Sequence, residues 1–201
     1  EEDIKILNNL HIDYLFIPEN NYIYSKNSFE IIDSGDLGEL YEGKSRPGHF
    51  DGVLTIVNRL FQLIDPKVAI FGKKDAQQLF LIKDMLLKKR YKAEIIEVKT
   101  IRENSGLALS SRNLLLTDNG KNKASLIYKI LKEAKKEFSN NRELSSFESF
   151  SSRYLNINFD YLEILDLETF SKPTKKTSEY IILAAALIEG VRLIDNIEFR
   201  M

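Results

Sequence analysis

The chain has 201 residues, 43% of them hydrophobic and 29% charged, a balance typical of a globular protein with one large or two modest domains. Lys and Arg total 29 against 30 Asp and Glu, so the net charge of −1 offers no overall attraction to nucleic acid or an anionic membrane. Cysteine is absent, which excludes disulfides and Cys-ligated zinc, and two histidines are too few for a histidine-built metal centre. No apolar run approaches the roughly 20 residues of a membrane span. We therefore expect a soluble, cytoplasmic protein that binds neither nucleic acid nor a membrane.

The first hundred residues are predicted to alternate strands and helices. Short apolar runs bounded by Pro or Gly indicate buried strands, and apolar residues at helical spacing indicate helices between them. The expected elements are a strand at 14–17, a helix at 53–64, a strand at 68–71, a helix through 79–86 and a strand at 93–98. Strand, helix and strand in the last three form a βαβ unit of a parallel sheet. Ligand sites of such sheets lie at the carboxyl ends of the strands.

The second half has a different pattern. After Thr100 a loop rich in Arg, Asn, Ser and Gly runs to Asn113, and Thr117 or Asp118 is a plausible cap for the helix that follows. The expected elements are a helix with apolar positions from 124 to 138, a weaker helix at 144–154, and strands at 159–165, 180–187 and 191–194, with Gly190 as the last turn. Strands without intervening helices indicate a small α+β domain. The predicted division is therefore 1–100 and 101–201.

The segment Phe71-Gly-Lys-Lys-Asp-Ala-Gln-Gln78 follows the second strand of the first half, where a helix begins. Gly72 lets the backbone approach a ligand, the helix start offers free N–H groups, and a lysine adds positive charge, which together suit a phosphate. The Asp75 carboxylate is a good acceptor for ribose hydroxyls. The alternative interpretation is a solvated, charged helix start. On spacing alone this alternative is favoured, because the P-loop pattern is absent.

The segment Gly106-Leu-Ala-Leu-Ser-Ser-Arg-Asn113 lies in the loop that joins the two halves. Ser110 and Ser111 offer hydroxyl donors, and Arg112 can bind phosphate oxygens through two nitrogens, so the segment could clamp a triphosphate. Ser-Ser-Arg is also common in loops without function. No histidine lies within the segment, so a serine hydrolase is not indicated.

Three segments together resemble the pantothenate synthetase family in order and spacing. They are Ser45-Arg-Pro-Gly-His-Phe50 with Gly52-Val53, Phe71 to Leu79, and Gly106 to Asn113; the ending Val191-Arg-Leu-Ile-Asp-Asn196 is also similar. The resemblance covers essentially the whole chain. It implies a Rossmann-like, nucleotidyltransferase-type parallel sheet domain, a small α+β C-terminal domain and a homodimer.

The resemblance also implies roles for single residues. Nucleotide contacts are expected from Gly72, Lys73, Lys74, Asp75, Ile101, Leu109, Ser110, Ser111 and Arg112. Of these, Lys74, Ser110, Ser111 and Arg112 are expected to act in catalysis, and Gln78 is expected to contact pantoate. Lys73 departs from the family, which commonly has Glu there. His49 does not match the family's catalytic histidines, so we expect a structural role for it.

Members of the family that this chain resembles begin with a strand and a His-x-Gly-His-type motif. This sequence does not contain that motif, and its first residues correspond to a later helix of the same domain. We therefore expect the N-terminal part of the parallel-sheet domain to be incomplete here. The residues upstream of Glu1 would be the most informative single observation.

The reaction implied by the resemblance is the ATP-dependent condensation of (R)-pantoate with β-alanine. Pantoate first attacks the α-phosphate to give pantoyl adenylate, and β-alanine then takes the acyl group, so that AMP and pyrophosphate are released and Mg²⁺ accompanies ATP. This step belongs to pantothenate and coenzyme A biosynthesis. Three alternatives stay open: an adenylyltransferase of another substrate, a nucleotide-binding protein without catalysis, and a structural or interaction protein.

Overall fold

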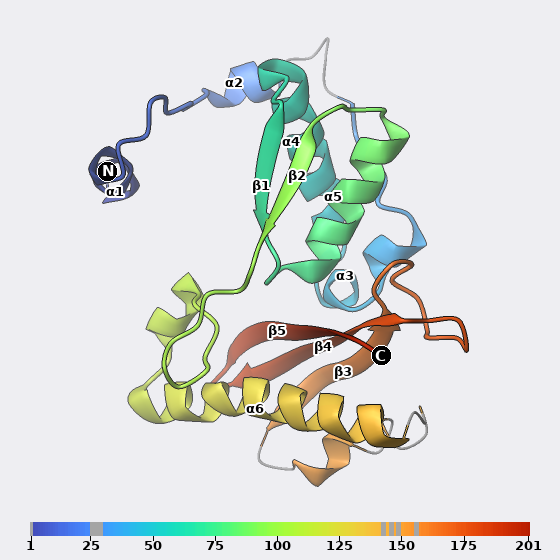
Figure 1. Cartoon of the computed structure of the whole chain (residues 1–201). Coiled ribbons are helices and arrows are strands. Elements are labelled where there is room, and N and C mark those ends of the chain that lie inside the picture. Colours follow the sequence, from blue (N-terminus) through green and yellow to red (C-terminus); the bar gives the residue numbers. More distant parts are fainter. Residues whose placement is uncertain (1, 25–29, 142–143, 145–146, 148–149, 155–156) are drawn as a thin grey trace.

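The computed structural model describes residues 2–24, 30–141, 144, 147, 150–154 and 157–201. It contains a two-stranded parallel sheet with helices and, after it in the chain, a three-stranded antiparallel sheet covered by one long helix (Figure 1). This is the expected fold class, a parallel sheet part followed by a C-terminal α+β part. The predicted division at residue 100 falls in the extended connection between the two sheets, and we retain it as a proposal for the domain boundary.

The N-terminal segment consists of α1 (Glu2–Asn9), an extended stretch and α2 (Asn20–Ile23). Figure 1 shows α1 lying apart from the rest of the chain. The buried strand predicted at 14–17 is wrong, because these residues form no strand and Tyr14 is 92% exposed. An apolar run becomes a strand only where a neighbouring strand pairs with its backbone, and no described strand does so here.

Three helical elements lead to the parallel sheet: η1 (Asp36–Glu39), α3 (Glu42–Ser45) and α4 (His49–Ile64). The predicted helix at 53–64 is confirmed but begins four residues earlier. It ends at Ile64, and the following Asp65 adopts the left-handed conformation with φ 46° directly before Pro66. The apolar face of α4 buries Phe50, Leu54 and Phe61.

The predicted βαβ unit is confirmed as β1 (Val68–Gly72), α5 (Ala76–Lys88) and β2 (Glu94–Val98). The two strands are parallel, with Val68 opposite Glu94. One face of this sheet packs on the core formed by α4 and α5. The other face is exposed and apolar, so these strands are less buried than predicted; it carries Val68, Ile70, Ile96 and Val98.

The connection after β2 contains an isolated bridge between Arg102 and Ala108, then η2 (Ser111–Leu115). It leads into α6 (Asp118–Asn141), which confirms the predicted long helix and its start. Most of the weaker helix predicted at 144–154 lies outside the described residues. The described part includes η3 (Ser151–Arg153).

The C-terminal sheet has the order β3 (Asn158–Asp166), β4 (Glu179–Ile188) and β5 (Val191–Arg200), all antiparallel. Glu189 and Gly190 make the turn between the last two strands, both with positive φ, as the primed turns of tight hairpins require. The predicted strand at 191–194 continues six residues further, through Asp195 and Asn196. One sheet face packs against α6.

The opposite face of the C-terminal sheet packs against the N-terminal part. Leu165, Phe170, Ile181 and Leu183 form a buried cluster, against which Phe80 of α5 and the segment around Leu37 pack. This contact brings the start of α5 close to β5. The carboxyl end of β1 therefore faces the antiparallel sheet (Figure 1).

Candidate active site

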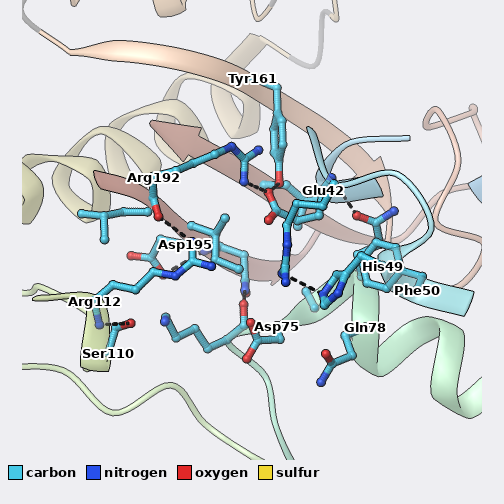
Figure 2. Close-up of a pocket in the computed structure, with 18 of the residues that line it drawn as sticks. Glu42, His49, Phe50, Asp75, Gln78, Ser110, Arg112, Tyr161, Arg192 and Asp195 are labelled. Atoms are coloured by element: carbon cyan, nitrogen blue, oxygen red, sulfur yellow. Dashed lines mark hydrogen bonds and ion pairs between the residues drawn. The ribbon is translucent and has the colours of Figure 1, made fainter. Parts of the chain in front are cut away.

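A pocket of about 240 Å³ lies where the carboxyl end of β1 faces the C-terminal sheet. Its walls come from both parts of the chain: α3 and the start of α4, the turn before α5, the Ser110 loop and strand β5 (Figure 2). Polar side chains dominate it. The charged members are Glu42, Arg46, Lys74, Asp75, Arg112, Arg192 and Asp195. The expected site residues Lys74, Asp75, Gln78, Ser110, Ser111 and Arg112 therefore line one cavity.

Lys74 stands at the start of α5, in the turn after β1. Its carbonyl oxygen accepts a hydrogen bond from the side chain of Asn196 at 2.9 Å. Its own ammonium group makes no hydrogen bond or ion pair with another described residue. The same holds for the neighbouring Asp75 carboxylate. A pocket cation and carboxylate that have no partner among the described residues are available to a ligand.

The adjacent glutamines Gln77 and Gln78 have different surroundings. Gln77 is 4% exposed; its amide donates to the carbonyl oxygens of Leu37 at 2.8 Å and Leu40 at 3.0 Å, and accepts from the Glu42 backbone at 3.1 Å. It therefore holds the segment before α3 against α5. Gln78 lines the pocket and makes no hydrogen bond to another described residue.

Ser110 and Arg112 form the opposite wall of the pocket (Figure 2). The Ser110 hydroxyl caps η2 by accepting from the Arg112 backbone N–H at 3.2 Å. The Arg112 guanidinium donates to the carbonyl oxygen of Arg192 at 2.9 Å. This bond uses one of the five donors of the guanidinium. The others can reach an anion in the pocket.

His49 lies in the pocket beside Arg46, at the first turn of α4. The Arg46 guanidinium donates to Nε2 of His49 at 2.7 Å, which requires the neutral imidazole. Burial lowers the pKa of His49, and the positive charge of Arg46 lowers it further. The structure thus adds Arg46 to the cations of the pocket. It was not among the residues predicted to contact ATP or pantoate, although it belongs to the Arg-Pro-Gly-His-Phe segment that resembles the family.

The roof of the pocket is an ion-pair cluster between α3 and the C-terminal sheet. Arg192 binds Glu42 at 2.5 Å and Asp160 at 2.7 Å, and the Tyr161 hydroxyl donates to Glu42 at 3.0 Å. Burial and the Glu42 charge raise the pKa of Tyr161, so it stays a donor. Gly43 lets α3 pack closely on η1, because a Cβ there would lie 1.7 Å from the carbonyl oxygen of Gly38. The two partners of Glu42 lie 119 and 150 residues further along the chain, and no pattern in the sequence linked them to it, although Arg192 belongs to the similar ending.

Four of the residues expected to contact nucleotide do not line this pocket: Gly72, Lys73, Ile101 and Leu109. Ile101 and Leu109 are exposed. The ammonium group of Lys73 turns to the other side of β1, where it binds Glu198 at 2.5 Å and Glu97 at 3.0 Å. On that side lies a larger groove of about 930 Å³, which is lined in part by apolar side chains.

Two features are absent from the described residues. No group of three or more His, Cys, Asp or Glu side chains there could hold a metal ion. None of the helices in the described part of the chain is long and apolar enough to cross a membrane.

Comparisons with known proteins show which family the chain belongs to. The family described as Pantoate-beta-alanine ligase matches residues 1–198. A pantothenate synthetase of Fervidobacterium nodosum is 38% identical over 201 residues, covering 98% of this chain and 71% of that protein. The solved structure of pantothenate synthetase from Thermus thermophilus is 34% identical with a TM-score of 0.84, over 98% of this chain and 73% of that one.

A third similar protein was solved with ligands. The pantoate-beta-alanine ligase from Francisella tularensis, complexed with beta-gamma ATP and beta-alanine, is 36% identical with a TM-score of 0.72, over 98% of this chain and 68% of that one. The match extends across both sheets and every wall of the pocket. This chain therefore belongs to the pantoate-beta-alanine ligase family, whose members are ligases that join pantoate to β-alanine with ATP.

Proposed function

We propose that the pocket between the two parts binds ATP and pantoate and forms pantoyl adenylate. The pantoate carboxylate attacks the α-phosphate and pyrophosphate leaves. The amine of β-alanine then attacks the acyl carbonyl, and AMP leaves with the formation of pantothenate. The observation that carries the proposal is Lys74, a pocket cation with no ion pair among the described residues, at the carboxyl end of β1 where α5 begins.

Negative charge on the phosphate oxygens is what this site would stabilise. Lys74, Arg112 and the hydroxyls of Ser110 and Ser111 supply positive charge and donors from two walls of one pocket. Such groups accelerate the reaction because they are positioned before the charge develops. No protein nucleophile is needed, since the substrate carboxylate attacks. We add Arg46 to these cations, because it lines the same pocket.

Gln78 is proposed to bind pantoate. It lines the same pocket as Lys74, so both side chains can reach the same ligand. Its amide offers a donor and an acceptor for hydroxyl and carboxylate groups. The structural role that a glutamine could play at this helix start is filled by Gln77 instead.

The nucleoside end of ATP is proposed to meet Asp75 through its ribose hydroxyls. The pocket volume of about 240 Å³ is below the range of about 300–1,000 Å³ usual for small-molecule sites. The nucleoside would therefore extend out of the pocket past Gly72, Ile101 and Leu109. A backbone contact from Lys73 is compatible with this path, whereas its ammonium group is held elsewhere.

Magnesium is proposed to enter on the triphosphate. Mg²⁺ keeps several waters and commonly uses one or two carboxylates together with substrate phosphates. In the pocket Glu42 and Asp195 are paired with arginines and Asp75 is assigned to the ribose, so the ion would be held by the phosphate oxygens and water. The ion would neutralise phosphate charge.

We also propose that the enzyme is a homodimer in the cytoplasm, as the resemblance implies. The apolar, exposed face of the parallel sheet offers a surface on which another protein surface could pack. Sedimentation equilibrium of the enzyme as it is made in the cell tests the dimer. A mass of one chain at micromolar concentration would contradict it.

The exchange of labelled pyrophosphate into ATP tests the proposed function. With ATP, Mg²⁺ and pantoate but no β-alanine, we expect label to enter ATP, because adenylate formation is reversible. Omitting pantoate should abolish the exchange. Exchange that proceeds without pantoate, or that requires β-alanine, would contradict the proposed order of steps.

A further inference from the structure

The strand β5 carries two adjacent polar residues that are both buried, Asp195 and Asn196, each 6% exposed. Successive side chains of a strand point to opposite faces of the sheet. Asp195 pairs across the sheet with Ala184, which belongs to the core beneath α6, and Asn196 pairs with Leu183, which belongs to the cluster facing the N-terminal part. Asn196 is thus directed at the start of α5.

The Asn196 amide binds the backbone that carries Lys74. Its Nδ2 donates to the carbonyl oxygens of Lys73 and Lys74, at 2.9 Å each. An amide nitrogen has two hydrogens, so both are used. These two carbonyls lie in the turn between β1 and α5, where neither a strand ladder nor a helix supplies them with donors.

Asn196 is itself held in place by Arg102 and Asp195. Arg102 binds both Asp195 oxygens, at 2.6 and 2.8 Å, and donates to the Asn196 carbonyl at 3.3 Å. The Asp195 carboxylate accepts from the Asn196 backbone at 2.8 Å. The guanidinium also lies 3.6 Å from the centre of the Tyr128 ring of α6. The donor amide is therefore anchored to the long helix of the C-terminal part.

We propose that Asn196 is a positioning residue for the ligase reaction, which acts by fixing the backbone of Lys74 from the C-terminal sheet. The proposal rests on the proposed phosphate-binding role of Lys74. Lys74 contributes the free cation, and its carbonyl is held while its ammonium group remains available. The lysine is thereby placed before ATP arrives, so little reorganisation is needed during the transfer.

A second contact between the same elements supplies a matched control. Two residues along β5, Glu198 binds the side chain of Lys73 at 2.5 Å. Replacing Glu198 by Gln weakens the contact between the two parts of the chain but leaves the carbonyl of Lys74 bonded. This variant separates the effect of a weaker contact between the two parts of the chain from the effect of a misplaced Lys74.

The test measures single-turnover formation of pantoyl adenylate in the enzyme as it is made in the cell. Asn196→Asp replaces the donor by an oxygen that faces two carbonyls, and we expect the rate to fall about tenfold or more. Asn196→Ser keeps one donor, should disturb folding less, and should give an intermediate rate. Glu198→Gln should keep the rate within about threefold of wild type, a difference under about 0.7 kcal/mol at about 1.4 kcal/mol per tenfold.

The most informative measurement combines Asn196→Asp with Lys74→Ala. In a Lys74→Ala background, Asn196→Asp should cause no more than about a twofold further loss, because residues that act through one another are not additive. Losses that multiply, or a folded Asn196→Ser enzyme with the wild-type rate, would overturn the positioning role. If Lys74→Ala alone keeps the wild-type rate, the proposed function of Lys74 fails as well, and the two failures are thereby told apart.

Discussion

Two regions meet at the pocket, and their polar side chains differ in how they are used. At the start of α5, the side chains of Lys74, Asp75 and Gln78 have no hydrogen bond or ion pair with other described residues. On β5, the side chains of Arg192 and Asp195 are bound to other parts of the protein. A pocket lining that is left unpaired is available to ligands, whereas a paired one holds the walls together. Substitutions in the two regions should therefore have separable effects on activity and on stability.

The largest expected effect is on stability, from the β5 side. Arg192→Met leaves the Glu42 carboxylate, whose side chain is 11% exposed, without its cation. Removing one partner of a buried pair costs about 3–5 kcal/mol, and we expect the lower end because Arg192 is 19% exposed. Urea unfolding measures this loss.

The control for that substitution is Arg200→Met at the end of the same strand. Arg200 pairs with Glu179 but its side chain is 83% exposed. Such surface pairs contribute about 0–1 kcal/mol. Equal losses from the two substitutions would remove the special role of the Glu42 pair.

The next effect is on chemistry, from the α5 side. Lys74→Ala should slow adenylate formation by about 10²-fold or more, as expected for the loss of one positioned charge at a transferring phosphate. The free energy of unfolding should change by no more than about 0.5 kcal/mol, since the ammonium group has no partner to lose among the described residues. Rapid-quench kinetics with denaturation of the same sample separates the two, and Lys83→Ala on the exposed side of α5 is the control.

The adjacent glutamines Gln77 and Gln78 should differ in the same way, one in stability and the other in ligand binding. Gln78→Ala should weaken pantoate binding by about 1.5–3 kcal/mol, the range for a hydrogen bond to a charged group, with unchanged stability. Gln77→Ala should instead lower the free energy of unfolding by about 1–3 kcal/mol, because it leaves the buried backbone N–H of Glu42 without its acceptor and removes the two bonds to the Leu37 and Leu40 carbonyls. Calorimetric titration and urea unfolding of both variants check this. The opposite assignment of effects would contradict the site.

The smallest effect concerns His49 and pH. Its pKa is lowered in the folded protein by burial, Arg46 and Arg112, against the opposing charges of Glu42 and Asp75. The unfolded chain therefore binds the proton more readily, so the stabilisation is present above about pH 6.5 and is lost as pH falls through the lowered value. His49→Gln should flatten the slope of stability against pH below about pH 6.5, measured by unfolding from about pH 5 to 7. His11→Gln is the control for removing a histidine elsewhere.

The sequence predicted best the elements whose pattern arises locally. The βαβ unit and the long helix α6 follow from apolar spacing and caps, and both are confirmed. The strand β5 was predicted only to residue 194, because Asp195 and Asn196 break the apolar pattern. Those two residues are buried because they bind Arg102 and the turn before α5, and such distant partners are not visible in a local pattern.

The site was predicted in the same uneven way. Lys74, Gln78 and the Ser110 loop were found because their segments resemble a family, and one pocket contains them all. Lys73 occupies the position next to Lys74, yet two carboxylates on β2 and β5 draw its side chain to the other face. The direction of a side chain depends on charges far away in the sequence. Spacing alone could not reveal it.

ATP and pantoate are proposed to bind in the pocket between α5 and β5. A crystal structure of the enzyme with a non-hydrolysable ATP analogue and pantoate tests this proposal most directly. We predict phosphate oxygens within hydrogen-bond distance, about 2.7–3.2 Å, of both Lys74 Nζ and the Arg112 guanidinium, with pantoate against Gln78. Phosphates bound instead in the larger groove, beside Lys73 and Lys83, would show that this pocket is not the nucleotide site.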